Sequence, residues 1–303
     1  KKFQNSNQTN IKYLSFKIIR DSLTRTQKML SKEMDIAPSV IPLGKISQFK
    51  RQSQNFQVFS STGFSTAYLL INLKNNFLKE KRLRKALSLT VNREEIIKYK
   101  LYGYAAPALS FINPSNYFFN KNLKPPEFNL KKAEDIINQM NLNGLELKLN
   151  CSNNSDTVSK ARVLASQIGK AGLKISLQTN EWGAFYKDIG RGAFDLALMK
   201  WVGVVDPDIY RVAFHSESQA PQGRNRSFYK NKKLDAMLEQ GFKERDKRKR
   251  KQIYDKVQEL IAEEFVVIPL WHDQELSVVQ TNVENYQMRS NGDFLFLPFV
   301  KKK

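Results

Sequence analysis

Cysteine, histidine and long apolar segments are scarce in this sequence, and each scarcity argues against a class of protein. The single cysteine, Cys151, excludes an internal disulfide framework and has no second thiol for redox chemistry. The two histidines, His215 and His272, have no further ligand-type residue at a recognisable metal spacing, so we expect no metal site. No apolar run approaches the roughly 18 residues of a membrane helix. The first ten residues are polar and lack the apolar core of a secretory signal.

Sequence motifs of catalysis are absent as well. The chain has no Walker A motif, no G-x-G-x-x-G fingerprint and no G-x-S-x-G nucleophile elbow. Gly190 and Gly192 belong to a predicted turn after a helix. His215 and Ser216 are adjacent in sequence, and adjacency alone does not make a base and nucleophile pair. We therefore expect a binding protein without catalytic residues or a cofactor.

Positive charge is in large excess. The chain has 50 lysines and arginines against 29 aspartates and glutamates, a formal net charge of +21. Such a charge favours phosphates, anionic lipid surfaces or acidic ligands. The basic residues are spread along the chain, without the base-stacking aromatics of a nucleic-acid site, which favours an ordinary solvated surface and no nucleic-acid partner. Binding to nucleic acid or an anionic surface is the competing hypothesis, motivated by the basic runs at residues 79–85 and 243–251.

The pattern of residues 12–38, near the start of the sequence, is that of a β-α-β unit. Residues 12–19 alternate apolar and polar side chains, as in a strand with one buried face. Asp21 and Ser22 can cap a following helix, and residues 35–38 should form a short extended segment. The inward stripe of the helix is expected to consist of Leu23, Leu30 and Met34.

A buried strand and two helices are expected next. Residues 68–73 form a continuous apolar run, which predicts a strand covered on both faces. Residues 79–90 have helical periodicity, with a basic face predicted to be solvated. Asn92, followed by Glu95, has the pattern of a capping box at the start of the second helix. The apolar face of the first helix comprises Leu83, Ala86 and Leu87.

Strands and helices then alternate with regular spacing. The strands are expected at residues 145–150, 173–177 and 194–199, with helices around residues 161–168 and 182–189 between them. Strands separated by crossover helices pair in parallel, so this region predicts an α/β fold. Later elements are expected to be helices at residues 234–242 and 245–263 and a strand at residues 265–271.

The loop after residues 194–199 has residue types that suit a polar ligand. Trp201 offers an indole face, and Gly203 allows close approach of the backbone. Asp206 and Asp208 offer carboxylates to an amine or a hydroxyl. Binding loops of α/β sheets lie at such strand ends. The structural alternatives are a core aromatic at Trp201 and a capped turn at Asp206.

Two arginines follow in the segment PQGRNR. Arg224 and Arg226 carry guanidinium groups that can hold a carboxylate by two parallel hydrogen bonds. The alternative is that both arginines are paired with carboxylates inside the protein.

Several segments resemble one family when they are taken in their order along the chain. They include YLLINL, RLRKALSLTVNREEI, FNLKKAEDIIN, FDLALMKWVGVVDPD and NRSFYKNKKLDAML, between Ile11 and His272. Together they are similar to the second part of the family 5 extracytoplasmic solute-binding proteins, which serve peptide and nickel ABC importers. The resemblance implies a periplasmic binding protein-like class II fold, an α/β architecture with mixed sheets flanked by helices in two lobes and no accessory N-terminal lobe.

The resemblance also implies regions and a function. Residues 1–73 would be a partial lobe I, residues 74–268 a ligand-binding α/β domain like lobe III, and residues 269–303 a return segment to lobe I. The protein would capture a peptide or small polar solute in an interlobe cleft and deliver it to the permease subunits of an ABC importer by hinge closure. We expect a periplasmic or extracytoplasmic monomer that meets the membrane only through the permease or a lipid anchor.

The same resemblance implies roles for the candidate residues. Trp201 would cover the ligand, Gly203 would expose its backbone, Asp206 would take a cationic group, and Arg226, with Arg224 nearby, would take a carboxylate.

Two departures from the family pattern bear on the ligand. The aspartate that holds a peptide amine in relatives corresponds to Val204, and the ligand-contacting tyrosine of the nickel branch corresponds to Val205. The chain also has no counterpart of the family's large N-terminal part and looks N-terminally incomplete. A truncated remnant without transport activity is therefore the second alternative.

Overall fold

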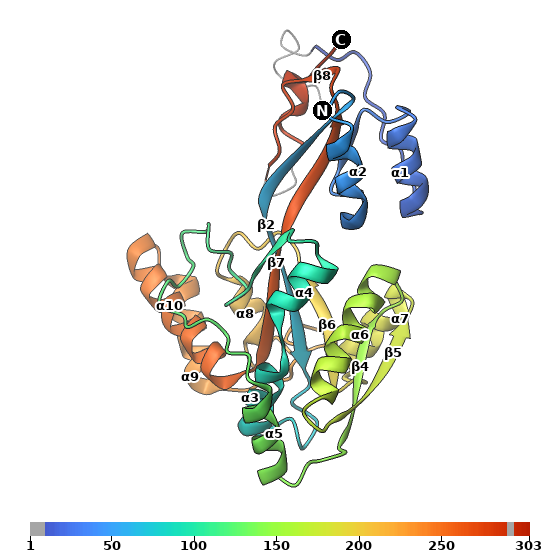
Figure 1. The fold of residues 1–303 in the computed structure, drawn as a ribbon. Coiled ribbons are helices and arrows are strands. Elements are labelled where there is room, and N and C mark those ends of the chain that lie inside the picture. Colours follow the sequence, from blue (N-terminus) through green and yellow to red (C-terminus); the bar gives the residue numbers. More distant parts are fainter. Residues whose placement is uncertain (1–9, 290–293) are drawn as a thin grey trace. The chain divides into compact units, whose positions relative to one another are not determined.

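A computed structural model describes residues 10–289 and 294–303 (Figure 1). The described chain divides into two compact units. One contains the residues up to Phe64 and from Asp273 onward, and the other is Ser65–His272. Strands β2 (Phe56–Ile71) and β7 (Val267–Gln280) contribute residues to both units. The regions 1–73, 74–268 and 269–303 stay a prediction about lobes.

The first unit is small and mixes short elements. It contains α1 (Ser22–Leu30), β1 (Ile36–Pro38), α2 (Ile46–Arg51), β8 (Val283–Glu284), β9 (Lys301–Lys302) and the 3-10 turns η2 (Leu43–Lys45) and η3 (Leu297–Phe299). Asp21 caps α1 by accepting from the Thr24 amide, as predicted. Strand β1 pairs antiparallel with β7, and Ile36 lies opposite Val279.

The predicted strand at residues 12–19 is wrong. These residues have no strand conformation, and Ile18 is 94% exposed. Alternating apolar and polar side chains only indicate that one side of the segment could be buried. A strand also needs a neighbouring strand to pair its amides and carbonyls, and no described strand pairs with these residues. Instead, the Arg25 guanidinium donates to the carbonyl of Ile19 at 2.7 Å. The predicted stripe of α1 is also wrong at Leu23, which is exposed.

The second unit is built on the larger part of the sheet. The strand order there is β7-β2-β6-β4-β5, with β3 (Ala105–Pro107) beside β7. Strands β4 (Glu146–Ser152), β5 (Lys174–Asn180) and β6 (Leu196–Trp201) confirm the predicted alternation, because β4 pairs parallel with both β5 and β6. Strand β2 pairs antiparallel with β6, so the sheet is mixed.

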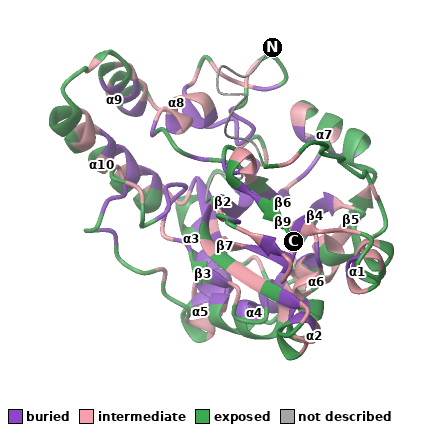
Figure 2. Cartoon of the chain, turned by 90° about the horizontal axis from the view of Figure 1, so that it is seen from above, coloured by how far each residue is buried: buried purple, intermediate pink, exposed green. Residues whose placement is uncertain are grey.

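Helices pack against this sheet, and all but those at residues 130–139 and 209–214 lie where the periodicity predicts. Figure 2 shows buried residues along the central strands and mixed burial on the helices. The helices are α3 (Lys81–Thr90), α4 (Arg93–Lys100), α5 (Leu130–Gln139), α6 (Ser155–Gly169), α7 (Trp182–Arg191), α8 (Ile209–Phe214), α9 (Lys232–Lys243) and α10 (Lys247–Glu264).

One hydrophobic core cluster joins the sheet to α8, α9 and α10. It contains the fully buried rings of Tyr210 and Tyr254 and the buried strand residues Tyr68 and Met199, which are partners across β2 and β6. Because this core lies against one face of β6, it fixes where the strand ends and where the candidate loop begins. Cys151 on β4 is buried, as expected of an inert thiol, and burial raises its pKa.

The basic face of α3 was predicted to be solvated, but one of its arginines is buried. Arg84 is only 3% exposed, and its guanidinium donates to the carbonyls of Glu264, Leu78 and Lys79 at 2.6–3.1 Å. It also approaches the Glu264 carboxylate at 3.4 Å. Arg84 therefore satisfies the last carbonyl of α10, which has no partner within the helix.

Candidate functional site

The candidate loop begins where β6 ends. Trp201 is the last residue of β6 and lies opposite Thr66 of β2. The chain then turns through Gly203, whose φ of 69° is in the left-handed region that favours glycine. A Cβ at Gly203 would meet nothing within 4 Å. The open space beside this glycine is compatible with close approach of a ligand to the backbone.

Trp201 is half-buried and combines both of the roles considered for it. Its ring packs against the core cluster, with its centroid 6.4 Å from that of Phe111. The guanidinium carbon of Arg226 lies 5.6 Å from the Trp201 ring centroid. The structure thus brings together two of the residues that the sequence singled out.

Arg226 is a buried cation held by aromatic side chains. It is 7% exposed, and its guanidinium carbon lies 4.6 Å from the ring centroid of Tyr186 on α7. It donates a hydrogen bond to the Tyr186 hydroxyl. Burial raises the pKa of Tyr68, and the charge of Arg226 opposes this shift. We call Trp201, Arg226, Tyr186 and Tyr68 the aromatic–arginine cluster.

Arg226 has no acidic counterion within the described chain. Within residues 10–289 and 294–303, no carboxylate oxygen forms an ion pair with Arg226 at 4.0 Å or less. Burying a charge costs several kcal/mol unless it is paired, and cation–π contacts return only about 0.5–2 kcal/mol. The guanidinium is therefore suited to receive an anionic group from outside the protein.

Asn225 positions this arginine. Its side-chain amide is fully buried and donates to the carbonyls of Phe214, His215 and Tyr229 at 2.9–3.2 Å. These bonds fix the chain on both sides of Arg226. Sequence reasoning missed Asn225, Tyr68 and Tyr186, because no local pattern distinguishes them from ordinary loop, strand and helix residues.

Arg224 and Arg226 have different surroundings. Arg224 is exposed, whereas Arg226 is buried. No ion pair of Arg224 is found in the part of the chain that the structure describes. The pair is thus not a single buried clamp, and the role of Arg224 in binding stays a prediction.

Asp206 and Asp208 are engaged inside the protein. Both oxygens of Asp206 accept hydrogen bonds from Arg250 on α10, at 2.7 and 2.9 Å, and the Arg250 guanidinium lowers its pKa. Asp206 also accepts from the Asp208 amide, and Asp208 accepts from Arg211 and Tyr254. This arrangement corresponds to the capped-turn alternative and speaks against Asp206 as a free partner for a ligand cation.

The two basic runs are partly neutralised by acidic neighbours. Lys81 pairs with Glu264 at 2.8 Å, and Lys251 pairs with Asp255 at 2.7 Å.

Among the described residues, no group of three or more histidines, cysteines and carboxylates could hold a metal ion. No described helix is long and apolar enough to span a bilayer.

Comparisons with known proteins agree on one family. The sequence model of the bacterial extracellular solute-binding proteins, family 5 Middle, matches residues 2–222. The chain is 25% identical over 283 residues to the probable di/tripeptide-binding protein 5 of Pseudomonas aeruginosa, covering 92% of this chain and 53% of that protein. It is 24% identical over 290 residues to the dipeptide-binding protein of Escherichia coli, covering 93% and 54%. The chain spans about half the length of these relatives.

Solved structures share the fold. The periplasmic binding protein DppA from Helicobacter pylori, in complex with the peptide STSA, superposes with a TM-score of 0.84 at 24% identity, covering 94% of this chain and 56% of that chain. NikZ from Campylobacter jejuni, in complex with Ni(L-His), gives a TM-score of 0.80 at 24% identity and covers 94% and 60%. The predicted class of fold is confirmed, and it is shared by proteins with different bound ligands.

Proposed function

Because the chain belongs to the bacterial extracellular solute-binding proteins of family 5, which are binding proteins and not enzymes, we propose that it is the substrate-binding component of an ABC importer. In this proposal it captures a short peptide or a related small polar solute outside the cytoplasm and passes it to a membrane permease. The printed names of relatives support this role, since they include di/tripeptide-binding and dipeptide-binding proteins.

The proposal rests on one observation: Arg226 is buried without an acidic partner in the described chain. A guanidinium that is 7% exposed and surrounded by the rings of Trp201 and Tyr186 can hold a ligand carboxylate by charge-assisted hydrogen bonds. Such a carboxylate would supply the missing counterion. The Trp201 ring would then cover an apolar part of the ligand beside its carboxylate.

The proposed recognition is led by the carboxylate. Val204 replaces the aspartate that would take an amine, and Asp206 is bound to Arg250. The loop therefore offers no uncommitted carboxylate at these two positions. We infer that ligands without a free amine bind this loop about as well as ligands with one.

Small molecules that accompany the protein from its native cells test the proposal. They would be released by denaturation and identified by mass spectrometry, in parallel for the W201A/R226A variant and for R162A, which removes an exposed arginine of α6. We expect carboxylate-bearing solutes with the wild type and R162A, and their loss with the double variant. The same solutes on all three proteins, or nucleic acid alone, would contradict the proposal.

A further inference from the structure

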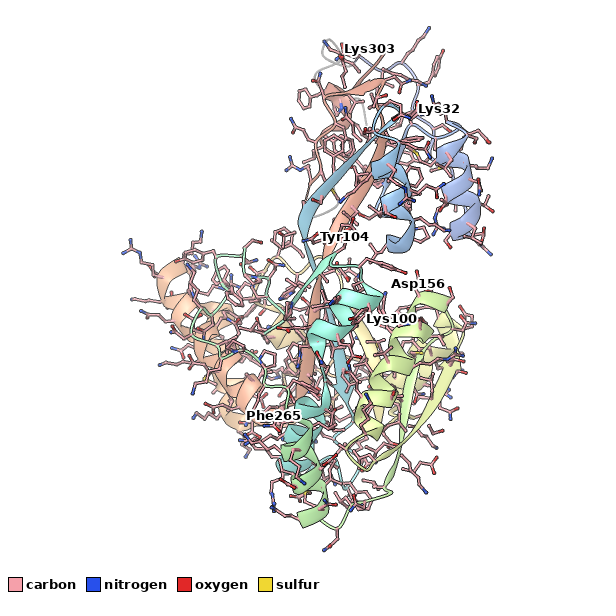
Figure 3. The ribbon with its side chains drawn as sticks, viewed as in Figure 1. Lys32, Lys100, Tyr104, Asp156, Phe265 and Lys303 are labelled. Carbon is pink, nitrogen blue, oxygen red and sulfur yellow. The ribbon has the colours of Figure 1, made fainter. Side chains whose placement is uncertain are left out.

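Three parallel strands of the second unit end at the same edge of the sheet. In the order β6-β4-β5, β4 ends at Ser152, β5 ends at Asn180 and β6 ends at Trp201. Because β4 pairs parallel with both neighbours, the chain leaves all three strands in the same direction. Asp156, labelled in Figure 3, lies in the first turn of α6 just after β4 and marks this edge. Loops at the carboxyl ends of parallel strands are where α/β sheets bind ligands.

Helix α7 starts at this edge with two exposed aromatic side chains. It begins at Trp182, two residues after the end of β5. The Trp182 residue is 56% exposed, and Tyr186, one turn later, is 41% exposed. Their ring centroids are 5.8 Å apart, and the ring planes are tilted by 38°. Two large rings that share an exposed surface are less usual than single exposed apolar residues, so we call Trp182 and Tyr186 the α7 aromatic pair.

The core holds the α7 aromatic pair in place. Phe185, between the two rings in sequence, is 1% exposed and belongs to the core cluster. Its ring centroid lies 5.8 Å from that of Trp182. The Glu181 carboxylate caps the helix by accepting from the Gly183 amide at 2.7 Å. The pair is therefore presented on an anchored helix start rather than on a free loop.

Tyr186 connects this pair to the aromatic–arginine cluster. Its hydroxyl accepts from Arg226, and the guanidinium carbon lies 4.6 Å from its ring centroid. Strand β4 separates β5 from β6, and adjacent strands are about 4.8 Å apart, so the loops after β5 and β6 leave the sheet roughly 10 Å apart. One residue of an extended chain spans about 3.3–3.6 Å. A ligand carboxylate at Arg226 therefore leaves the side chain of the same ligand residue within reach of Trp182.

The charges beside the α7 aromatic pair favour an apolar side chain over a cationic one. Arg226 and the exposed Lys187 would repel a second cation. The nearest carboxylates are already engaged: Glu181 caps the helix, and Asp188 accepts from the Asn180 side chain at 3.0 Å. Aromatic rings attract one another in tilted or offset arrangements at centroid distances of about 4.5–7 Å. An aromatic ligand side chain thus matches this surface in both polarity and shape.

We propose that the α7 aromatic pair selects ligands whose carboxylate-bearing residue has an aromatic side chain. The carboxylate accepts from Arg226, and the ligand ring packs against Trp182 and Tyr186. This inference rests on the proposed function and adds a ligand class to it, namely short peptides that end in phenylalanine, tyrosine or tryptophan. Trp182 is then a specificity-determining residue that sets which carboxylates bind best.

Two dipeptides that differ only in a ring test the assignment on the wild-type protein. Isothermal titration calorimetry should give about tenfold tighter binding of Ala-Phe than of Ala-Ala, because the ring is buried against an aromatic pair. Ala-Lys should bind no more tightly than Ala-Ala. Equal affinities for Ala-Phe and Ala-Ala, or a preference for Ala-Lys, would overturn the inference.

Fluorine NMR locates the ligand ring without relying on affinity. The chain has three tryptophans, Trp182, Trp201 and Trp271, and all three can be replaced by 5-fluorotryptophan. The Trp182 resonance, assigned by its absence from the W182A spectrum, should shift with Ala-Phe and not with Ala-Ala. The Trp201 resonance should shift with both dipeptides. A Trp182 resonance that Ala-Phe leaves unmoved would overturn the inference.

A pair of variants tests Trp182 itself. W182A should reduce the preference for Ala-Phe over Ala-Ala to less than about threefold and leave the affinity for Ala-Ala unchanged. Y99A, which removes an exposed ring of α4, is the matched control and should keep the full preference. Circular dichroism and thermal melting establish that both variants fold. A folded W182A that keeps the preference would overturn the inference.

The C-terminal amide of Ala-Phe distinguishes this inference from the proposed function. If the wild type prefers Ala-Phe to its amide but binds Ala-Ala as tightly as Ala-Phe, the carboxylate site at Arg226 stands and selection by the α7 aromatic pair is refuted. If the acid and the amide bind equally, or no dipeptide binds, the proposed function fails and this inference fails with it.

Discussion

The replacement of Arg226 by glutamine should separate binding from stability. Removal of one partner of a buried ion pair usually costs about 3–5 kcal/mol, because the other charge is left uncompensated. Arg226 is buried against Trp201, Tyr186 and Tyr68 without an acidic partner in the described chain. We therefore expect R226Q to impair ligand binding and to leave the folded state nearly as stable as before.

The magnitude follows from the contacts. Loss of the charge removes cation–π attraction of about 0.5–2 kcal/mol and weakens the hydrogen bond to the Tyr186 hydroxyl. It also removes the desolvation penalty of an unpaired buried ion, which is several kcal/mol. Because these effects oppose each other, the free energy of unfolding should change by less than about 1 kcal/mol. Loss of charge-assisted bonds to a ligand carboxylate should weaken binding about 10- to 100-fold.

Arg84 is the matched control. It is similarly buried, but R84Q would deprive the carbonyls of Glu264, Leu78 and Lys79 of a donor. At about 1 kcal/mol for each carbonyl, the expected loss of stability is about 3 kcal/mol. Urea unfolding followed by circular dichroism measures both variants. A loss as large in R226Q as in R84Q, with unchanged ligand affinity, would show that Arg226 is a structural residue and refute the reasoning.

Other predictions concern single residues of the loop and sheet. Arg250 lowers the pKa of Asp206, so this pair stabilises the fold fully above the unfolded pKa and loses its contribution as pH falls through the folded pKa. Below about pH 4, the wild type should therefore lose stability more steeply than D206N. The difference should be under about 1 kcal/mol, because the aspartate side chain is 58% exposed. Acid titration of the urea midpoint measures this, and identical slopes would contradict it. G203A should cost about 1–2 kcal/mol in urea unfolding, since φ is 69° and no neighbour clashes; no loss would mean that the loop relaxes. Cys151 should react with a thiol reagent only after unfolding, because it is buried and its pKa is raised; rapid native labelling would refute this.

The sheet of the second unit was predictable because its signals are local. The alternation of Leu147 and Leu149 and the helical spacing through Ala161 and Ile168 correspond to β4 and α6. These periods specify which side chains face the core. The polar first part of β2 gave no such signal, and its strand begins twelve residues before the predicted start at Tyr68.

Contacts between residues far apart in sequence were harder to predict than the periodicity of helices and strands. Residues 12–19 have the alternation of a strand but no neighbour to pair with. Asp206 meets Arg250 across 44 residues, and Arg84 meets Glu264 across 180. A sequence segment carries no record of such distant partners. The same limit explains why Arg226 was selected by residue type, whereas its aromatic surroundings emerged only from the fold.

The affinity of the protein for Ala-Phe, compared with that for the C-terminal amide of Ala-Phe, tests the central claim most directly. Isothermal titration calorimetry at neutral pH measures both. If Arg226 receives a ligand carboxylate, the acid should bind about 10- to 100-fold more tightly than the amide, and R226Q should abolish the difference. Equal affinities for the acid and the amide, or no binding of either, would contradict the account.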